Sequence, residues 1–271
     1  MLKLLVRDAL SVMRWGLHRL LRRPVRSGVR ILLYHAIATL PRRRDRWRLS
    51  VPPALLAAHV AWLRRHGYAI VSLEDALDMI RGTRPMIEKA VAVTFDDGFR
   101  DVLTQAYPIL RQAQVPATVF VVPGCLGSPE PFPWVEPSVG FARPLQWEEL
   151  QTLLGDQLVS IGSHTWSHRT LSRLPVEEQG LELARSKSAL EARLGTSVKW
   201  LAYPYGHAGS FSQETIACVQ RVGFEAAFAN IMGVNRAGDS LWMVRRTRVG
   251  WDDRLWRFHL KMAGAYDWLD R

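Results

Sequence analysis

Short apolar runs alternate with amphipathic helical segments along most of the 271 residues. The apolar runs have the length and composition of buried strands, and we predict strands at 30–35, 68–71, 91–95, 117–122, 159–163, 200–203, 226–228 and 242–249. Helices are predicted at 53–66, 73–81, 102–114, 147–155 and 176–194, and again from Asp252. This alternation is what a parallel α/β barrel requires, and one such domain commonly has this length.

Two adjacent carboxylates end the strand predicted at 91–95. Asp96 and Asp97 follow Phe95 directly, and Gly98 comes next. Neighbouring residues of an extended chain point to opposite sides, so one acid can bind a metal while the other accepts a proton. The alternative is that one of them caps a helix beginning near Phe99.

A pair of histidines ends the apolar run at 159–163. His164 and His168 are four residues apart, and one helical turn would bring both imidazoles to the same side. Two imidazole nitrogens and one carboxylate oxygen bind a divalent ion and leave part of its coordination sphere open, as a catalytic metal requires. The alternative is a pair of solvated surface histidines, but the nearby acid pair favours a metal site.

Three motifs follow one another in the chain: Thr94-Phe95-Asp96-Asp97-Gly98, His164-Thr165-Trp166-Ser167-His168 and Tyr203-Pro204-Tyr205-Gly206. In order and spacing they resemble the first three motifs of the polysaccharide deacetylases, the NodB-homology group of carbohydrate esterase family 4. The resemblance extends from about Arg30 to Val249. It implies an α/β fold, a distorted parallel (β/α) barrel of about seven strands, and metal-dependent removal of acyl groups from N-acylated sugars.

The resemblance also implies roles for single residues. Asp97, His164 and His168 would hold the metal, Asp96 would take a proton from a water that the metal activates, and the backbone N–H of Tyr205 would stabilise the oxyanion. Zinc is the first expectation for the metal, although this ligand set also accepts cobalt, nickel or iron.

The sequence departs from the family at two places. The late strand lacks the histidine that usually protonates the leaving amine, and His35 is the expected acid in preference to His259, because Tyr34-His35 resembles the biofilm-exopolysaccharide deacetylase branch with permuted motifs. Ala202 stands where the third motif usually begins with an arginine. Arg246 matches an arginine on the late strand of that branch and is expected to steady Asp96 instead.

Positive charge is concentrated at the N-terminus. The chain has a formal net charge of +11, and residues 1–48 hold thirteen Lys or Arg but two acids, so the remainder is neutral. We therefore divide the chain into a basic amphipathic segment, 1–28, and a catalytic domain, 29–271. Without a zinc finger or a basic and aromatic stacking surface, a nucleic-acid partner is not expected.

Residues 1–23 are predicted to form an amphipathic helix. Its apolar residues fall on one face and its basic residues mostly opposite, while an uninterrupted apolar core and a signal-peptide cleavage site are lacking. Such a helix can lie on an anionic membrane surface, which predicts a cytoplasmic protein at the inner face of the membrane. The alternative is a helix packed on the barrel.

Three further features are open to two interpretations. The basic loop Pro41 to Arg48 could gate the site or contact phosphate. The aromatics of the loop Pro123 to Pro144 form either a wall for a sugar ring or an anchor for the loop itself; they are Phe132, Trp134 and Phe141. His59 and His66 are expected to be structural, and Cys125 and Cys218 to be buried thiols rather than a disulfide.

The expected function is removal of N-acetyl groups from an N-acetylated glycan or a lipid-linked sugar. Two alternatives stay open. One is hydrolysis of another C–N bond, as in deformylases or allantoinases, since related folds perform that chemistry. The other is glycan binding without turnover, which is suggested by Ala202 in place of the usual third-motif arginine.

Overall fold

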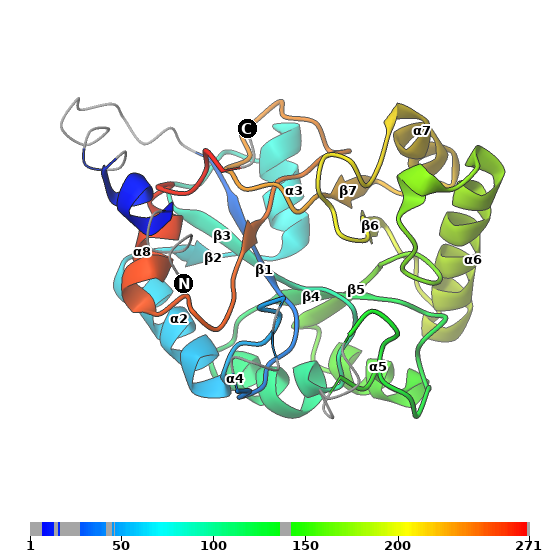
Figure 1. The fold of residues 1–271 in the computed structure, drawn as a ribbon, viewed down its shortest axis with the longest axis horizontal. Helices are drawn as coiled ribbons and strands as arrows, with labels where there is room; N and C mark the ends of the chain where they lie inside the picture. The colour runs from blue at the N-terminus through cyan, green and yellow to red at the C-terminus, as the bar shows by residue number, and fades with distance from the viewer. Residues whose placement is uncertain are drawn as a thin grey trace.

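The computed structural model describes residues 7–13, 16, 28–41, 45, 47–135 and 142–269. A curled sheet of eight parallel strands lies at its centre, with helices around it (Figure 1). The strands are β1 (Arg30–Tyr34), β2 (Ala69–Ile70), β3 (Ala90–Phe95), β4 (Ala117–Val121), β5 (Val159–Ser163), β6 (Trp200–Ala202), β7 (Ala226–Phe228) and β8 (Thr247–Arg248). The helices are α2 (Pro53–Arg65), α3 (Leu73–Arg81), α4 (Tyr107–Gln112), α5 (Trp147–Leu154), α6 (Val176–Leu194), α7 (Gln213–Arg221) and α8 (Leu255–Met262). The predicted distorted α/β barrel is confirmed.

Seven strands follow one another in the order β7-β6-β5-β4-β3-β1-β8. The short strand β2 pairs with Ala90 and Val91 at the start of β3, whereas β4 pairs with the last three residues of β3. Every pair is parallel, so the carboxyl ends of the strands lie on one rim. Functional side chains in such folds gather at this rim.

The segment from 242 to 249 connects the two ends of the sheet. Val244 pairs with Phe228 of β7, and three residues later Thr247 and Arg248 pair with Leu32 and Leu33 of β1. The predicted continuous strand is therefore wrong, because this segment crosses from one edge strand to the other and forms only short pairings with each. This segment thus reaches both edges of the curled sheet.

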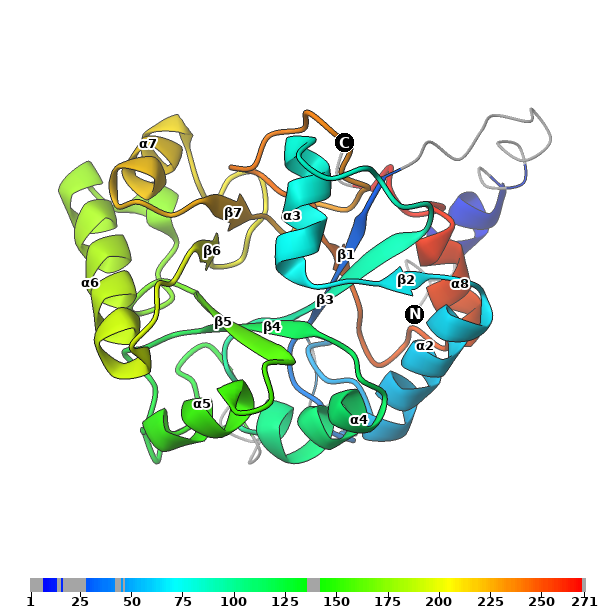
Figure 2. The ribbon, with the colours of Figure 1, turned by 180° about the vertical axis from the view of Figure 1, so that it is seen from behind.

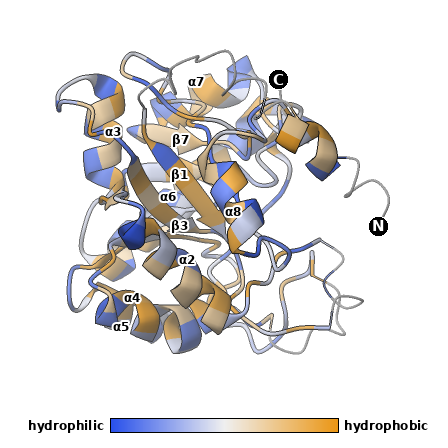
Figure 3. Cartoon of the chain, turned by 90° about the vertical axis from the view of Figure 1, so that its left-hand side faces the viewer, coloured by the Kyte–Doolittle hydropathy of each residue, from blue (hydrophilic) through white to orange (hydrophobic). Residues whose placement is uncertain are grey.

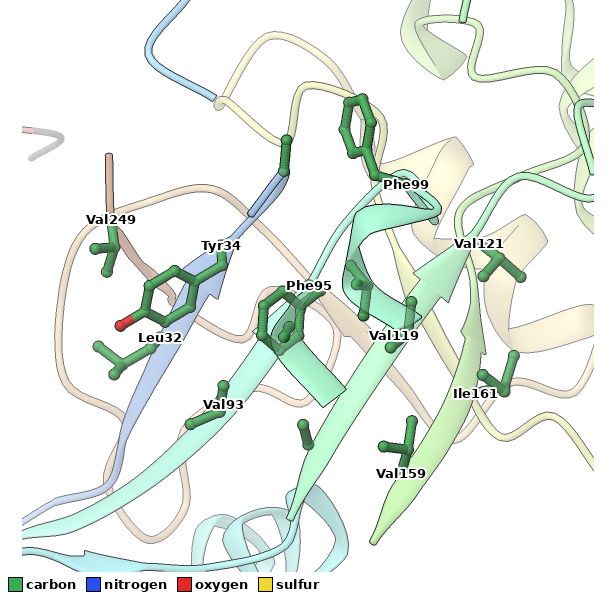
Figure 4. Close-up of a cluster of buried hydrophobic side chains, with 14 of the residues drawn as sticks. Leu32, Tyr34, Val93, Phe95, Phe99, Val119, Val121, Val159, Ile161 and Val249 are labelled. Atoms are coloured by element: carbon green, nitrogen blue, oxygen red, sulfur yellow. The ribbon is translucent and has the colours of Figure 1, made fainter. Parts of the chain in front are cut away.

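Alternate strand residues face two different layers. One set packs against α2, α4, α5, α6 and α7 and includes Leu32, Tyr34, Val93, Phe95, Val119 and Ile161, shown in Figure 4. The other set packs around α3, which Figure 2 shows between β1 and β7, and includes Ile31, Ala92, Phe120 and Phe228. Asp96 continues the second set, since strand neighbours alternate.

Local signals set the ends of the best-predicted helices. Ser72 accepts a hydrogen bond from the N–H of Asp75 (3.0 Å) at the start of α3, and Gly82 ends the helix with φ of 83°. Gly195 ends α6 with φ of 67°. Both helices have the predicted bounds, because side-chain caps and left-handed glycines are encoded in a few adjacent residues.

Residues 7–13 are helical, and their polar side packs on α8 and on the residues that follow it. Asp8 accepts a hydrogen bond from Tyr266 (2.9 Å) and pairs with Arg257, and Ser11 accepts one from Trp268 (3.3 Å). The apolar side chains of this helix are exposed: Leu10, Val12 and Met13. The remainder of the helix predicted for 1–23 falls on residues outside the described ranges, apart from Gly16, and the domain boundary at residue 28 stays a prediction.

Candidate metal centre

Asp96 and Asp97 lie at the carboxyl end of β3, both buried. The N–H of Asp96 bonds to the carbonyl of Tyr34 (2.9 Å) and prolongs the sheet, whereas Asp97 and Gly98 have φ of 72° and 80° and turn the chain away. Neither acid caps a helix, because the next helical turn begins only at Val102. The capping interpretation is therefore wrong.

His164 follows β5 directly. Its backbone N–H bonds to the carbonyl of Val121 (2.7 Å), and its Nδ1 lies 2.7 Å from the carbonyl oxygen of Ala202. A carbonyl accepts only from N–H, so the proton is on Nδ1 and the lone pair of Nε2 faces the site. That Nε2 lies 3.6 Å from Oδ1 of Asp97 and 3.8 Å from Oδ2 of Asp96.

His168 reaches the same place by a loop. Thr165 and His168 have φ of 63° and 59°, so the interpretation of the two histidines as one helical turn is wrong. The His168 ring stacks on Trp134 with centroids 4.0 Å apart, and its Nε2 lies 3.3 Å from Oδ1 of Asp97. Glu182 of α6 holds the loop by accepting hydrogen bonds from the N–H (2.9 Å) and Oγ (2.6 Å) of Ser167.

The three side chains fit a divalent metal ion. Their ligand atoms all lie within 4.8 Å of one another, and all three residues are buried. Ligand atoms about 2.0–2.2 Å from a tetrahedral zinc ion lie about 3.3–3.6 Å from one another. The two Asp97–histidine distances given above fall in that range. Asp97, His164 and His168 therefore form a candidate metal site.

Burial dominates the electrostatics of this cluster. Burial raises the pKa of Asp97 to about 8, and the charge of Asp96 adds to the rise. Trp134 and Arg246 lower this pKa, although the indole nitrogen of Trp134 makes no full hydrogen bond. Burial also lowers the pKa of His164, and that of His168 well below its usual value. At neutral pH both imidazoles are thus neutral and the carboxyl is protonated in the metal-free protein.

Metal affinity is expected to rise as the pH is raised toward 8. One proton must leave Asp97 for each ion bound, so the association constant should increase about tenfold per pH unit below that pKa. Titration calorimetry with Zn²⁺ between pH 6 and 9, in buffers of different ionisation enthalpy, would measure the affinity and count the proton. Affinity that is flat over this range, with no proton released, would contradict the assigned Asp97 protonation.

Arg246 and Asp96 form a buried ion pair at the inner side of the sheet. Nη1 and Nη2 of Arg246 each lie 2.7 Å from a carboxylate oxygen of Asp96, and Nε donates to the carbonyl of Ala229 (3.0 Å). Burial alone would raise the pKa of Asp96. The charge of Arg246 has the largest opposing effect, and together with His164 and the hydrogen bonds from Arg246 it brings this pKa below its usual value. Asp96 is thus ionised at neutral pH.

Two aromatic rings lie beside the Arg246 guanidinium. Ala202 belongs to the same buried cluster as Phe120 and Phe228, and the Arg246 guanidinium lies over these two rings at 5.6 and 6.0 Å. A guanidinium from the late segment thus reaches Asp96, where the family pattern would supply one from the third motif.

His35 stands on the same rim, directly after β1. Its pKa is lowered to about 4, chiefly by burial, while Asp96 raises it and Arg246 lowers it. The segment after His35 is fixed by Asp101, whose Oδ1 accepts from the N–H of Ile37 (2.9 Å). His259 lies instead on α8, exposed and with its ring 5.5 Å from that of Trp62.

Tyr205 completes the rim. Its φ is 63°, its side chain is exposed, and its ring lies 4.9 Å from that of His168. Among the described residues, eight non-glycine residues have positive φ, and four of them belong to this centre: Asp97, Thr165, His168 and Tyr205. The loops of the site are therefore held in conformations that ordinary side chains disfavour.

In the described part of the aromatic loop, Phe132 and Trp134 pack toward the centre. Phe132 is buried and stacks on Trp134 at 4.8 Å, and Trp134 covers His168. The interpretation of Phe132 as a sugar wall is wrong, and Phe141 lies outside the described residues. Sequence reasoning missed Asp101 and Glu182, because each acts on the backbone of a distant loop and carries no local signal.

The comparisons with known proteins agree with one another. A family model described as polysaccharide deacetylase matches residues 83–227, more than half of the chain. The YxkH protein of Bacillus subtilis is 27% identical over 81% of this chain and 70% of its own length. The poly-beta-1,6-N-acetyl-D-glucosamine N-deacetylase of Escherichia coli K12 is 26% identical over 71% of this chain, which spans 33% of that protein. The solved structure of IcaB from Ammonifex degensii superposes with a TM-score of 0.75 and 26% identity, covering 89% of this chain and 98% of that one.

Proposed function

The chain belongs to the polysaccharide deacetylases, hydrolases of amide bonds, and we propose that it removes N-acetyl groups from a glycan of N-acetylated hexosamine. The observation that carries this is the convergence of Asp97, His164 and His168 beside the Asp96–Arg246 pair. Because the Escherichia coli relative is a poly-beta-1,6-N-acetyl-D-glucosamine N-deacetylase, poly-β-1,6-N-acetylglucosamine is the first substrate to test.

Each residue has a task in this proposal. Asp97, His164 and His168 would hold a divalent cation, zinc first, which makes water acidic enough at neutral pH to attack an amide carbonyl. Asp96, kept ionised by Arg246, accepts the proton of the attacking water. The N–H of Tyr205, which makes no hydrogen bond within the described ranges, is available to stabilise the oxyanion.

His35 is the proposed acid for the leaving nitrogen. With a pKa of about 4 it is neutral at pH 7 before substrate binds, so it must gain its proton during the catalytic cycle and then transfer it to the amine. This fits its place on the rim near Asp96, the group that collects the proton from water.

The test is acetate release from a panel of N-acetylated glycans after loading with Zn²⁺, Co²⁺, Ni²⁺ or Fe²⁺, with elemental analysis of the loaded protein. Acetate released in proportion to bound metal is expected. Full loading without acetate from any glycan would sink the proposal. Formamides and cyclic ureides in the same panel address hydrolysis of other C–N bonds.

Replacing His35 by glutamine is expected to lower kcat by about 10²–10⁴-fold, the usual range for a lost acid, and to leave metal content unchanged. His259→Gln is the matched control, because that residue is the other histidine considered for the role and lies on α8. Steady-state kinetics with metal analysis checks both variants. Equal activity of the two would remove His35 from the mechanism.

Glycan binding without turnover is the weaker alternative. Its motive was the missing arginine at Ala202, and the Arg246–Asp96 pair supplies a cation to the same carboxylate. Retention on immobilised glycan without acetate release, despite full metal loading, would favour it.

We also propose contact with an anionic membrane surface, through the N-terminal helix, at the cytoplasmic face. The exposed Leu10, Val12 and Met13 support the contact, since they face away from α8. Within the described ranges, none of the helices has the length and apolar character needed to cross a bilayer. A lipid-linked sugar is accordingly a second substrate class to assay.

A further inference from the structure

Three of the five buried side chains of helix α6 are polar. Helices around the sheet carry apolar and polar residues together, as Figure 3 shows for α2 and α4. The buried residues of α2 are apolar apart from one histidine: Leu56, Val60, Leu63 and His59. Those of α6 are Gln179, Glu182, Leu183, Ser186 and Leu190. A buried polar side chain is costly without partners, so each of the three polar residues points to a specific contact.

Two of these polar residues hold the segment 163–168, which we call the metal loop, at both of its ends. The Oγ of Ser186 lies 2.5 Å from the Oγ of Ser163, the residue before the first metal-binding histidine. Glu182 accepts hydrogen bonds from the N–H (2.9 Å) and the Oγ (2.6 Å) of Ser167, the residue before the second histidine. Each contact thus lies one residue away from a proposed metal ligand.

The middle of the metal loop is held as well. The guanidinium of Arg185, which also belongs to α6, lies over the ring of Trp166 at 3.9 Å. The carbonyl of Trp166 accepts a hydrogen bond from the N–H of Gly124 (2.9 Å), in the segment that follows β4. A Cβ at position 124 would lie 2.5 Å from that carbonyl oxygen, so a side chain there would push the loop away. The metal loop therefore contacts both α6 and the segment after β4.

The two metal-binding histidines are supported in different ways. The Nδ1 of His164 donates to the carbonyl of Ala202 (2.7 Å), which is the kind of direct support that ligand histidines usually have. The Nδ1 of His168 is buried and has no hydrogen-bond partner within the described ranges. The ring of His168 stacks on Trp134, and its backbone N–H bonds to the Oγ1 of Thr165 (3.1 Å). The orientation of His168 thus depends more on the backbone of the metal loop than that of His164 does.

We propose that Glu182 is a positioning residue of the metal centre: it fixes the backbone directly before His168 and so holds that imidazole ready for a divalent cation. One buried carboxylate satisfies two donors of Ser167, and its removal would leave both without this acceptor. Loss of a group that orients a metal ligand usually lowers metal affinity by about 10–100-fold. The inference rests on the metal role in the proposed function, and it does not depend on which bond is hydrolysed.

Two substitutions at Glu182 and one matched control test the inference. Glu182→Leu removes both acceptors, whereas Glu182→Gln keeps an acceptor for the N–H of Ser167 and an amide that can donate to its Oγ. Glu191→Leu is the control, because Glu191 of the same helix accepts from the N–H of Val198 (3.0 Å) and the Oγ of Ser197 (3.3 Å), both outside the metal loop. Titration calorimetry with Zn²⁺ in competition with a chelator measures the affinity of all four proteins, and urea unfolding measures their stability.

We expect Glu182→Leu to bind Zn²⁺ about 10–100-fold more weakly than the wild type, and Glu182→Gln to keep most of the affinity. Glu191→Leu should lose stability and keep its zinc affinity. Equal affinity of Glu182→Leu and the wild type, an equal loss in Glu191→Leu, or no zinc binding by the wild type overturns the proposal.

If Glu182→Leu fails to fold by circular dichroism, Ser167→Ala replaces it, because this variant lacks the shorter of the two hydrogen bonds. A smaller loss of zinc affinity is then expected, and no loss would contradict the proposal. Zinc binding with the expected differences but without acetate release from any glycan would count against the proposed function alone, so the two failures are distinguishable.

Discussion

Replacing Arg246 by methionine is expected to lower the free energy of unfolding at pH 7 by about 3–5 kcal/mol and to abolish nearly all activity. The guanidinium is fully buried and bidentate on Asp96, so its loss leaves an uncompensated carboxylate in the core. The pKa of Asp96 is lower in the folded protein than in the unfolded chain, so its ionisation stabilises the fold above the unfolded pKa. This stabilisation is lost in acid, as the folded carboxylate becomes protonated. The destabilisation should therefore shrink below about pH 4.

The double variant Asp96→Asn/Arg246→Met separates stability from chemistry. With both charges removed, most of the lost unfolding free energy should return, because neutral replacement of a buried pair is tolerated far better than loss of one partner. Activity should stay lost, since the proposed base is gone. Arg245→Met is the neighbouring control. Urea unfolding followed by fluorescence measures all four proteins, and a loss under about 1 kcal/mol in the single variant would contradict the assignment.

Asp97→Asn is expected to have opposite effects on stability and on activity. The metal-free wild type should lose stability as the pH rises from about 4 to about 8, because the unfolded carboxyl ionises near 4 while the folded one, with its pKa raised to about 8 by burial, keeps its proton. The amide removes this effect, so the metal-free variant should be the more stable protein at pH 8, by on the order of a few kcal/mol.

The same change should abolish tight metal binding and lower the rate of deacetylation by on the order of 10³-fold or more, since several kcal/mol of catalysis depend on the cation. Thermal unfolding in a chelator, metal analysis and acetate release give the three readouts. His66→Ala, at an exposed histidine directly after α2, is the control. An Asp97→Asn protein that retains a full equivalent of metal and normal turnover would remove Asp97 from the centre.

Local signals made much of the fold predictable. Ser72 and Gly82 bound α3, Gly195 ends α6, and the apolar runs of β1, β3 and β7 lie where the sequence places them. Strand 242–249 was overpredicted, because its residues have strand character while their pairing depends on two partners 16 and 215 residues away. The β-propensity of a segment does not show that it crosses from one edge strand to the other.

The candidate centre was predictable in its residues and less so in its geometry. The acid pair and the histidine pair are readable motifs, but the helical-turn interpretation failed because Thr165 and His168 adopt left-handed backbone conformations held by tertiary contacts. Trp134 stacks on His168, and Glu182 accepts a hydrogen bond from Ser167. Each contact joins chain segments that are far apart in the sequence. No spacing rule connects them.

The left-handed residues of the rim set a limit on engineering this scaffold. Glycine at Asp97, Thr165, His168 or Tyr205 would relieve a conformational cost on the order of 1–3 kcal/mol per position, yet at Asp97 and His168 it would delete a ligand. Selection for heat resistance alone would thus tend to erode the reaction centre. Stabilising substitutions should therefore be placed on remote helices such as α6, and the left-handed residues of the rim should be kept.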